Sequence, residues 1–209
     1  MFYNKYNFII KDFTASDYSR PEITGVLVSP KKTIATDSFM LLEVDSVKAD
    51  PKDFPVIPDK PKMRVDFKPF ILPKEKAGDV IKLFGKDNDS LPIINNAIVI
   101  RSNKMEVDNR AEIGKTDLES YNSVMSRVIE GDFPDTKDLM KESGEYTEIE
   151  VNPALLKKIA GFFDSFRSSK TDSIKIRVPI DAQSPIFFTG KRDSTEQTAT
   201  ALLMPIKAS

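Results

Sequence analysis

Val128-Ile129-Glu130-Gly131-Asp132-Phe133-Pro134-Asp135 is the stretch that best explains how this chain is organised. A strand-like run ends in glycine, and a single aromatic residue then precedes a proline. Gly131 tolerates backbone angles that other residues avoid, whereas Pro134 fixes its own φ and biases Phe133 toward an extended conformation. The stretch therefore predicts a constrained joint that closes one domain and starts the next segment.

The composition is that of a folded protein without strong global charge. The 209 residues suffice for one large domain or two small ones, and 40% are hydrophobic while 30% are charged. The 31 basic and 32 acidic side chains nearly cancel, so any electrostatic function must come from local segregation of charge. Residues 1–10 lack a small-residue cleavage site, and no apolar run approaches the roughly 20 residues of a membrane span. We therefore expect a cytoplasmic protein that does not enter a membrane.

The chain contains neither cysteine nor histidine. This composition excludes disulfides, thiolate metal sites, and the Ser-His and Cys-His nucleophile pairs. Acidic clusters occur at Asp132, Asp135 and Asp138 and at Asp87 and Asp89, but neither has a full calcium-loop signature, so solvated turns are expected and no metal is predicted. A glycine-rich phosphate loop is also missing from the sequence. We predict no catalytic residue and no cofactor.

Helix-then-strands patterns occur three times along the chain. The first has an amphipathic helix over residues 2–13 and strands over 23–29, 33–36 and 40–44. The second has a helix over 74–84 and strands over 91–94, 97–101, 104–107 and 121–130, with a polar stretch around Gly114. The third has a strand over 146–151, a helix from Asn152-Pro153 to about Arg167, and strands over 173–180, 185–189 and 198–206. The pattern predicts an α+β fold.

Two interpretations stay open at this level. The helices are spaced by about 70 to 80 residues, which suits a duplicated supersecondary unit, but any α+β protein alternates loosely in this way. Six prolines between Asp50 and Pro73 favour an extended connection over a helix or a central strand. A proline-rich ligand segment is the alternative for this connection, although interspersed apolar residues indicate anchoring on a core.

Basic residues lie off the apolar faces of all three predicted helices. Such a face is usually the ordinary solvent-exposed side of an amphipathic helix. If the helices belong to repeated units, however, they would form one basic surface that contacts phosphates without reading sequence. The candidate DNA-binding residues are Lys5, Lys11, Lys74, Lys76, Lys82, Lys157, Lys158, Arg167 and Lys170.

Several short motifs, in order, resemble the bacterial DNA polymerase III β sliding clamp. They are Arg20-Pro21, Gly25-Val26-Leu27-Val28, Ile34-Ala35-Thr36-Asp37-Ser38, the joint at 128–135, Asn152-Pro153-Ala154-Leu155-Leu156 and Ala201-Leu202-Leu203-Met204-Pro205-Ile206. The resemblance implies a DNA-clamp fold, in which repeated βαβββ-like units place helices on one face of antiparallel sheets. One departure is Ser38-Phe39-Met40, where the family typically has Gly-His-Arg and DNA contacts near that turn.

The resemblance also implies a domain assignment. Residues 1–137 resemble the clamp's middle domain of two half-units, and residues 138–209 resemble the closing half of its last domain. The family ring holds twelve half-domains and this chain offers three, so a ring requires four chains or another subunit. A homo-oligomer is therefore expected.

The family binds partner proteins in an apolar groove that takes short linear peptides. Carried over by motif, the groove residues are Leu41, Pro134, Leu139, Leu202 and Met204. Simple core packing is the alternative for Leu202 and Met204, given their strand alternation.

The function that the resemblance implies is that of a processivity factor rather than an enzyme. It would hold duplex DNA non-specifically, tether a DNA polymerase through the groove, and meet clamp-loader-like proteins through the same kind of peptide. The alternative is a clamp-derived module that regulates replication proteins without forming a ring.

Overall fold

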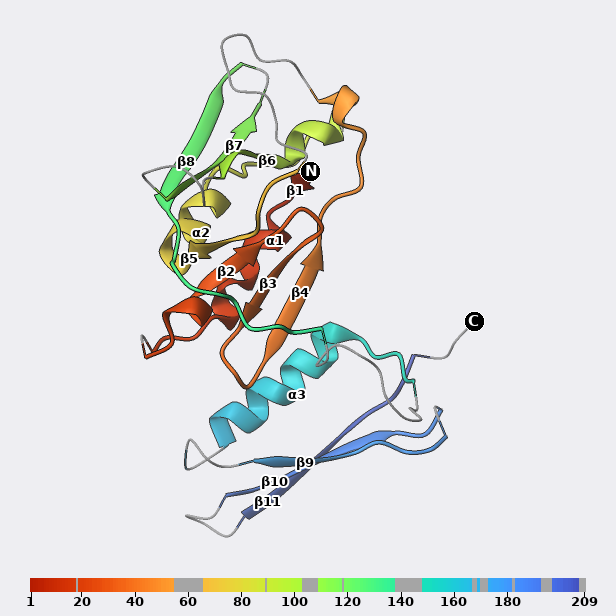
Figure 1. Ribbon diagram of the computed structural model, residues 1–209. Coiled ribbons are helices and arrows are strands. Elements are labelled where there is room, and N and C mark those ends of the chain that lie inside the picture. The colour runs from red at the N-terminus through yellow and green to blue at the C-terminus, as the bar shows by residue number, and fades with distance from the viewer. Residues whose placement is uncertain are drawn as a thin grey trace. The chain divides into compact units, whose positions relative to one another are not determined.

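The computed structural model divides the chain into two compact units, Met1–Asp138 and Leu139–Ser209. Each unit has its own helices and sheets (Figure 1). The residues that the structure describes are 1–17, 19–54, 66–88, 90–102, 109–117, 119–137, 148–166, 169, 173–181, 183–192 and 197–206. The assignment of the units to particular clamp domains stays a prediction.

The first unit consists of two halves with the same order of elements. The first half is β1 (Phe2–Tyr3), α1 (Tyr6–Ile9) with the 3₁₀ helix η1 (Ile10–Phe13), η2 (Pro21–Ile23), β2 (Gly25–Val28), β3 (Lys32–Thr36) and β4 (Leu41–Asp45). After η3 (Pro51–Asp53), the second half is β5 (Phe70–Pro73), α2 (Lys74–Ile81), η4 (Pro92–Asn95), β6 (Ala97–Ser102), β7 (Arg110–Thr116) and β8 (Tyr121–Arg127). Each half is thus a βαβββ unit, which confirms the predicted fold class.

The two halves exchange their first strands. One antiparallel sheet has the order β4-β3-β2-β5 and the other has the order β1-β6-β7-β8, so β5 completes the first half's sheet while β1 completes the second's (Figure 1). The middle of β5 pairs with β2 through Ile71 opposite Leu27. Neither half can therefore complete its four-stranded sheet without the other.

Each exchanged strand also remains bonded to its own half. The amide of Val47, just beyond β4, donates to the carbonyl of Phe2 over 2.8 Å, and the amide of Ile129, just beyond β8, donates to the carbonyl of Ile71 over 2.9 Å. An exchanged strand thus has one edge on its own half and the other on the partner half. Each exchanged strand thus makes backbone hydrogen bonds on both of its edges.

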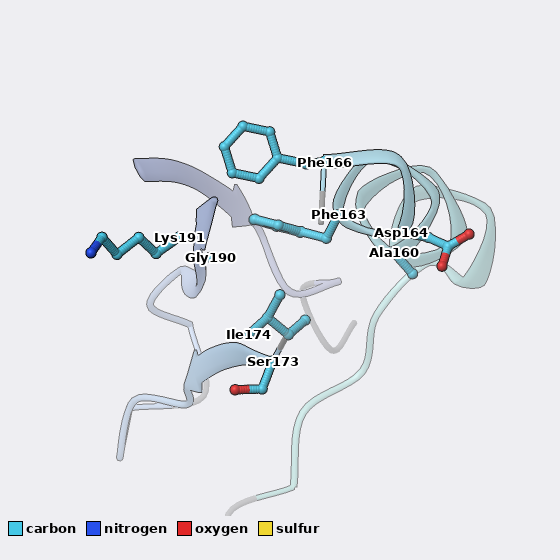
Figure 2. A pocket seen from close by; sticks show the side chains of 8 residues that line it. All are labelled: Ala160, Phe163, Asp164, Phe166, Ser173, Ile174, Gly190 and Lys191. Atoms are coloured by element: carbon cyan, nitrogen blue, oxygen red, sulfur yellow. The ribbon is translucent and has the colours of Figure 1, made fainter. Parts of the chain in front are cut away.

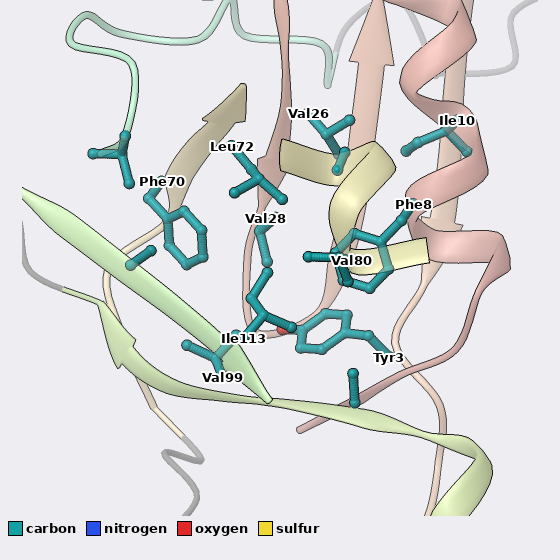
Figure 3. Packing of buried hydrophobic residues seen from close by; sticks show 14 of the residues in the cluster. Tyr3, Phe8, Ile10, Val26, Val28, Phe70, Leu72, Val80, Val99 and Ile113 are labelled. Atoms are coloured by element: carbon teal, nitrogen blue, oxygen red, sulfur yellow. The ribbon is translucent and has the colours of Figure 1, made fainter. Parts of the chain in front are cut away.

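The core of the first unit lies where the helices meet both sheets (Figure 3). Phe8 on α1 and Val80 on α2 are fully buried, and so are Val26 and Val28 on β2. The rings of Phe8 and Phe84, which follows α2, lie 6.2 Å apart. Apolar contacts from both halves therefore form one shared core.

Asn7 is a buried polar residue that fixes α1 on the first sheet. Its side-chain amide donates to the Thr33 hydroxyl over 3.1 Å and to the carbonyls of Val44 and Asp45 over 3.1 and 3.0 Å. A buried amide without such partners would cost free energy, so these bonds specify the position of α1.

The second unit is a single helix on a three-stranded antiparallel sheet. It consists of α3 (Pro153–Phe166), β9 (Ile174–Arg177), β10 (Ile186–Arg192) and β11 (Gln197–Leu203), in the sheet order β11-β10-β9. Phe163 of α3 packs on the buried residues Ile186, Phe188 and Leu203 of the sheet. The Asn152 side chain accepts the Ala154 amide over 2.9 Å, which confirms the predicted start of the helix.

The first predicted helix, over residues 2–13, is wrong in its N-terminal part. Phe2 belongs to strand β1, and the helix begins at Tyr6. Tyr6 and Ile9, whose spacing is helical, are exposed, whereas Phe8 is buried. The helical spacing misled because a two-residue strand and a short helix follow each other within one apolar run.

Two further predictions in the second half were wrong. Residues 92–95 form a 3₁₀ helix rather than a strand, and the stretch around Gly114 is the seven-residue strand β7. In β7 the polar side chains alternate with buried Ala111 and Ile113, so its polarity belongs to one face. The strand predicted over 104–107 lies outside the described residues. Residues 148–151 have no strand assignment.

The joint has the constrained backbone that its sequence predicts. Gly131 has a φ of +123°, a value that favours glycine. The hydroxyl of Thr136, which is buried, donates to the Glu43 carboxylate of β4 over 3.2 Å. The residues after β8 are thus fixed along the first unit.

Gly25 offers a test of the strand exchange. A Cβ at this position would lie 2.5 Å from the carbonyl oxygen of Leu72 in β5 and 2.8 Å from Ile71 Cγ2. We expect Gly25→Ala to destabilise the first unit by about 1–3 kcal/mol, because the backbone of β5 must move. The measurement is urea unfolding followed by circular dichroism. Gly85→Ala, where a Cβ meets no atom within 4 Å, is the control and should change stability little. Equal effects of the two variants would contradict the close pairing of β2 and β5.

Candidate functional site

The candidate basic surface of the first unit lies on two neighbouring helices. A Cβ at Gly78 of α2 would lie 3.7 Å from Cε of Lys11, so the aliphatic stem of Lys11 runs from η1 across α2. Lys11 Nζ lies 2.8 Å from Asp12 Oδ1, and Lys5 Nζ lies 3.5 Å from Asp87 Oδ2. Both lysines thus have acidic neighbours, and surface pairs of this kind exchange readily with other anions.

Asp79, near the end of α2, lies between Lys76 and Lys82. Its carboxylate oxygens are 3.0 Å from Lys76 Nζ and 2.9 Å from Lys82 Nζ. The hydrogen bond from Lys82, followed by that from Lys76, holds the pKa of the Asp79 carboxyl below its ordinary value. Asp79 therefore neutralises part of this basic cluster, although 77% of the Lys82 side chain remains exposed.

The remaining lysines differ in environment. Lys74 opens α2, is half-buried, and lines a small pocket with Pro21, Thr24 and Ile129. Lys157 and Lys158 are exposed on α3, and neither forms an ion pair within the described part of the chain. Arg167 and Lys170 lie outside the described residues.

Arg20 is a basic residue that the sequence analysis did not include in the surface. Its Nη1 donates to the Ser38 hydroxyl over 3.1 Å, at the turn where Ser38 has a φ of +78°. Its Nε lies 3.3 Å from Glu22 Oε1. The contact joins residues 18 apart in the sequence, so local sequence patterns could not place Arg20 at this turn. A cation therefore lies where the chain departs from Gly-His-Arg.

The predicted groove residues are distributed over both units. Leu41 opens β4, and Pro134 lies in the joint; both are half-buried in the first unit. Leu202 and Met204 are each 55% exposed at the end of β11, whereas Leu203 between them is buried. Core packing within the second unit therefore does not account for Leu202 and Met204. Leu139 lies outside the described residues, and the groove itself stays a prediction.

The acidic clusters do not converge in the described residues. Within that part of the chain, no group of three or more carboxylates could hold a metal ion. Asp87 pairs with Lys5, while Asp89 and Asp138 lie outside the described residues. No helix of the described chain is long and apolar enough to cross a membrane.

Comparison with known proteins finds similarity among solved structures. No family model and no curated protein matches the chain. Among solved structures, Caulobacter crescentus pol III beta matches 100% of this chain with a TM-score of 0.63 and 14% sequence identity. This likeness confirms the clamp resemblance at the level of the fold. The chain spans about half, 51%, of the length of that protein.

The contacts of Lys76 and Lys82 with Asp79 can be tested by titrating the Asp79 carboxyl group. Because its folded-state pKa is depressed, Asp79 adds stability above its unfolded pKa of about 3.9, and that contribution is lost as the pH falls through the folded pKa. We expect Lys82→Met to raise the Asp79 pKa more than Lys76→Met does, as measured by NMR of the carboxyl carbon. Asp17, whose pKa is lowered by hydrogen bonds from Ser19, is an internal control and should not respond. An unchanged Asp79 pKa in both variants would contradict the assigned contacts.

Proposed function

We propose that this chain is a clamp-like processivity factor of DNA replication, which holds duplex DNA non-specifically and tethers a DNA polymerase. The observation that carries the proposal is the clamp fold itself, matched over the whole chain with a TM-score of 0.63. The protein acts by association rather than catalysis, and its composition, without histidine or cysteine, is compatible with that role. In this proposal it acts in the cytoplasm as a homo-oligomer, as the resemblance to ring-forming clamps implies.

Lysines on and beside the helices of the first unit support the DNA-binding part of the proposal. α1 and α2 are neighbours that share a core; Lys11 lies on η1, directly after α1, while Lys76 lies on α2 and Lys82 directly follows it. Flexible ammonium groups contact phosphates without reading base edges, as a protein that moves along DNA requires. The acidic neighbours of these lysines weaken the attraction, which favours a mobile association over tight binding. In the second unit, Lys157 and Lys158 are exposed candidates of the same kind on α3.

An apolar surface at the end of β11 supports the tethering part. Leu202 and Met204 expose large side chains that would otherwise favour burial. In this proposal they are the anchoring surface of the partner groove, and Leu41, Pro134 and Leu139 are the further groove residues that the clamp resemblance implies. A groove of this kind takes short peptides through a few anchoring side chains, and polymerase and loader proteins would compete for it.

Comparing circular with linear DNA tests directly whether the protein holds duplex DNA by encircling it. We expect the protein to remain on nicked circular plasmid during gel filtration and to leave the linearised plasmid through its ends. Reversing Lys82, Lys157 and Lys158 to glutamate should weaken binding and reduce the magnitude of the salt slope by about one for each lost phosphate contact.

Matched charge variants keep the DNA test specific. Lys31→Glu, on the turn between β2 and β3, changes the charge equally and should have a much smaller effect. Asp79→Asn should act in the opposite direction and strengthen binding, because it removes the anion between Lys76 and Lys82. Equal retention on linear and circular DNA would rule out encirclement, and unchanged binding in the lysine variants would remove these helices as the DNA surface.

The groove can be tested with an unbiased peptide array. Peptides that bind the wild-type protein should carry at least two large apolar side chains within about five residues, since an apolar groove needs anchors. Leu202→Ser with Met204→Ser should weaken their binding at least about tenfold, measured by fluorescence anisotropy. Phe39→Ser, at an exposed apolar residue of the first unit, is the control. If the control weakens binding as much as the β11 variant does, this groove assignment is wrong.

A further inference from the structure

The second unit repeats the hydrogen bond that holds an exchanged strand to its own half. The amide of Ile206, just beyond β11, donates to the carbonyl of Glu150 over 2.7 Å. Glu150 precedes the first residue of α3 by three positions, as Ile71 precedes the first residue of α2. Residues 149–151 therefore occupy, in the second unit, the place that β1 and β5 have in the halves of the first unit.

In the second unit, the sheet edge that would receive an exchanged strand is unpaired within the described residues. The sheet has the order β11-β10-β9, and no strand of the described residues pairs with the second edge of β9. In the first unit the equivalent edge of β2 is occupied by β5. Residues 149–151 likewise have no described strand on their far edge. The second unit thus presents both a strand to donate and an edge to receive one.

Side-chain exposure on β9 is consistent with an unpaired strand edge. Ile176 of β9 lies opposite Phe188, which is buried in the core, yet Ile176 is 55% exposed. Val26, which lies opposite Leu72 of β5 in the first unit, is 0% exposed. Ile176 and Val26 both lie in the strand that follows a helix, and they differ in whether a neighbouring strand is present. An open edge with exposed apolar residues is a surface that requires a partner.

Among the described residues of the second unit, no helix packs on α3 as α1 and α2 pack on each other. Leu155 and Phe162, two turns apart on one flank of α3, are 46% and 49% exposed. Between α3 and the start of β9 lies a pocket of about 230 Å³ lined by Phe163, Phe166 and Ile174, among others (Figure 2). The start of β9 is therefore bordered by a cavity whose lining includes apolar side chains.

We propose that the second unit is completed by the second unit of another copy of this chain, through reciprocal exchange of residues 149–151. Each copy donates this segment to the β9 edge of the other, and the two α3 helices pack together. Because one unit carries both the strand and the edge, the contact is self-complementary and closes with twofold symmetry. The first unit shows that two halves of this architecture join in this way.

The side chains of residues 149–151 are complementary in charge to those of β9. Side chains alternate along both segments, so Ile149 and Val151 lie on one face and Glu150 on the other. On β9, Ile174 and Ile176 alternate with Lys175 and Arg177. A pairing that places apolar residues opposite apolar residues therefore places Glu150 of one copy opposite Lys175 or Arg177 of the other, which stabilises the pair.

The inference deepens the homo-oligomer of the proposed function by naming its interface. It is nevertheless tested without DNA or polymerase, so failure of DNA retention and failure of this contact are separate results. Of the groove residues, Leu202 lies on β11, at the opposite edge of the sheet from β9, and Met204 follows directly after this strand.

Solution mass is the primary measurement, made on the full chain by light scattering over a concentration series. The wild-type protein should contain an even number of copies, and Ile176→Lys should halve that number while leaving the circular dichroism spectrum unchanged. Its side chain is already exposed in the single unit, so folding does not require isoleucine here. We expect the dissociation constant to rise about a hundredfold or more, because the change occurs twice in a twofold interface.

Two sets of variants make the result decisive. Phe39→Lys, at a 94% exposed residue of the first unit, should leave the mass unchanged. Glu150→Lys should dissociate the protein at least about tenfold more readily, and adding Lys175→Glu and Arg177→Glu to it should restore association. A wild-type monomer at all concentrations, an unchanged mass in Ile176→Lys, or a charge swap that fails to restore association would each overturn the proposal.

Discussion

The structure depends on the exchange of the first strands between halves. A half that folds alone has three strands and leaves one sheet edge unpaired, and an unpaired edge costs hydrogen bonds and exposes apolar side chains. In the first unit β1 and β5 satisfy both edges at once, and the bonds to Val47 and Ile129 keep each strand on its own half. The shared core around Phe8 and Val80 follows from this exchange, since it brings the helices of both halves together.

The sequence predicted elements whose signals are local. Helix α3 was predicted because Asn152 and Pro153 form a recognisable start and its apolar residues recur at helical spacing. Strand β7 was missed because charged side chains alternate along it and its apolar content is limited to Ala111 and Ile113. Strand β1 was missed because two residues carry no period, and its pairing with β6 joins residues about 95 positions apart.

For the candidate site too, local features could be predicted from the sequence and contacts between distant residues could not. Lysines on polar helix faces could be recognised from spacing, but their acidic neighbours could not. Asp87 reaches Lys5 across 82 residues, and Arg20 reaches Ser38 across the first sheet's turn. The net effect is a basic surface partly neutralised by carboxylates, with Asp79 at its centre. Such a surface attracts phosphates weakly at each point, and binding then depends on geometry that keeps DNA close rather than on the strength of single contacts.

The second unit shows what the exchange means when only one half is present. Its backbone repeats the bond that holds a first strand in place, through Ile206 and Glu150, so the half is ready for exchange before any partner arrives. The exposed Ile176 is then a consequence of architecture rather than a defect of the sequence. Lys175 and Arg177 on the same edge discourage random pairing with other copies of β9, because like charges would meet there. They still admit a segment that carries Glu150, so the same residues that protect the open edge also select what can close it.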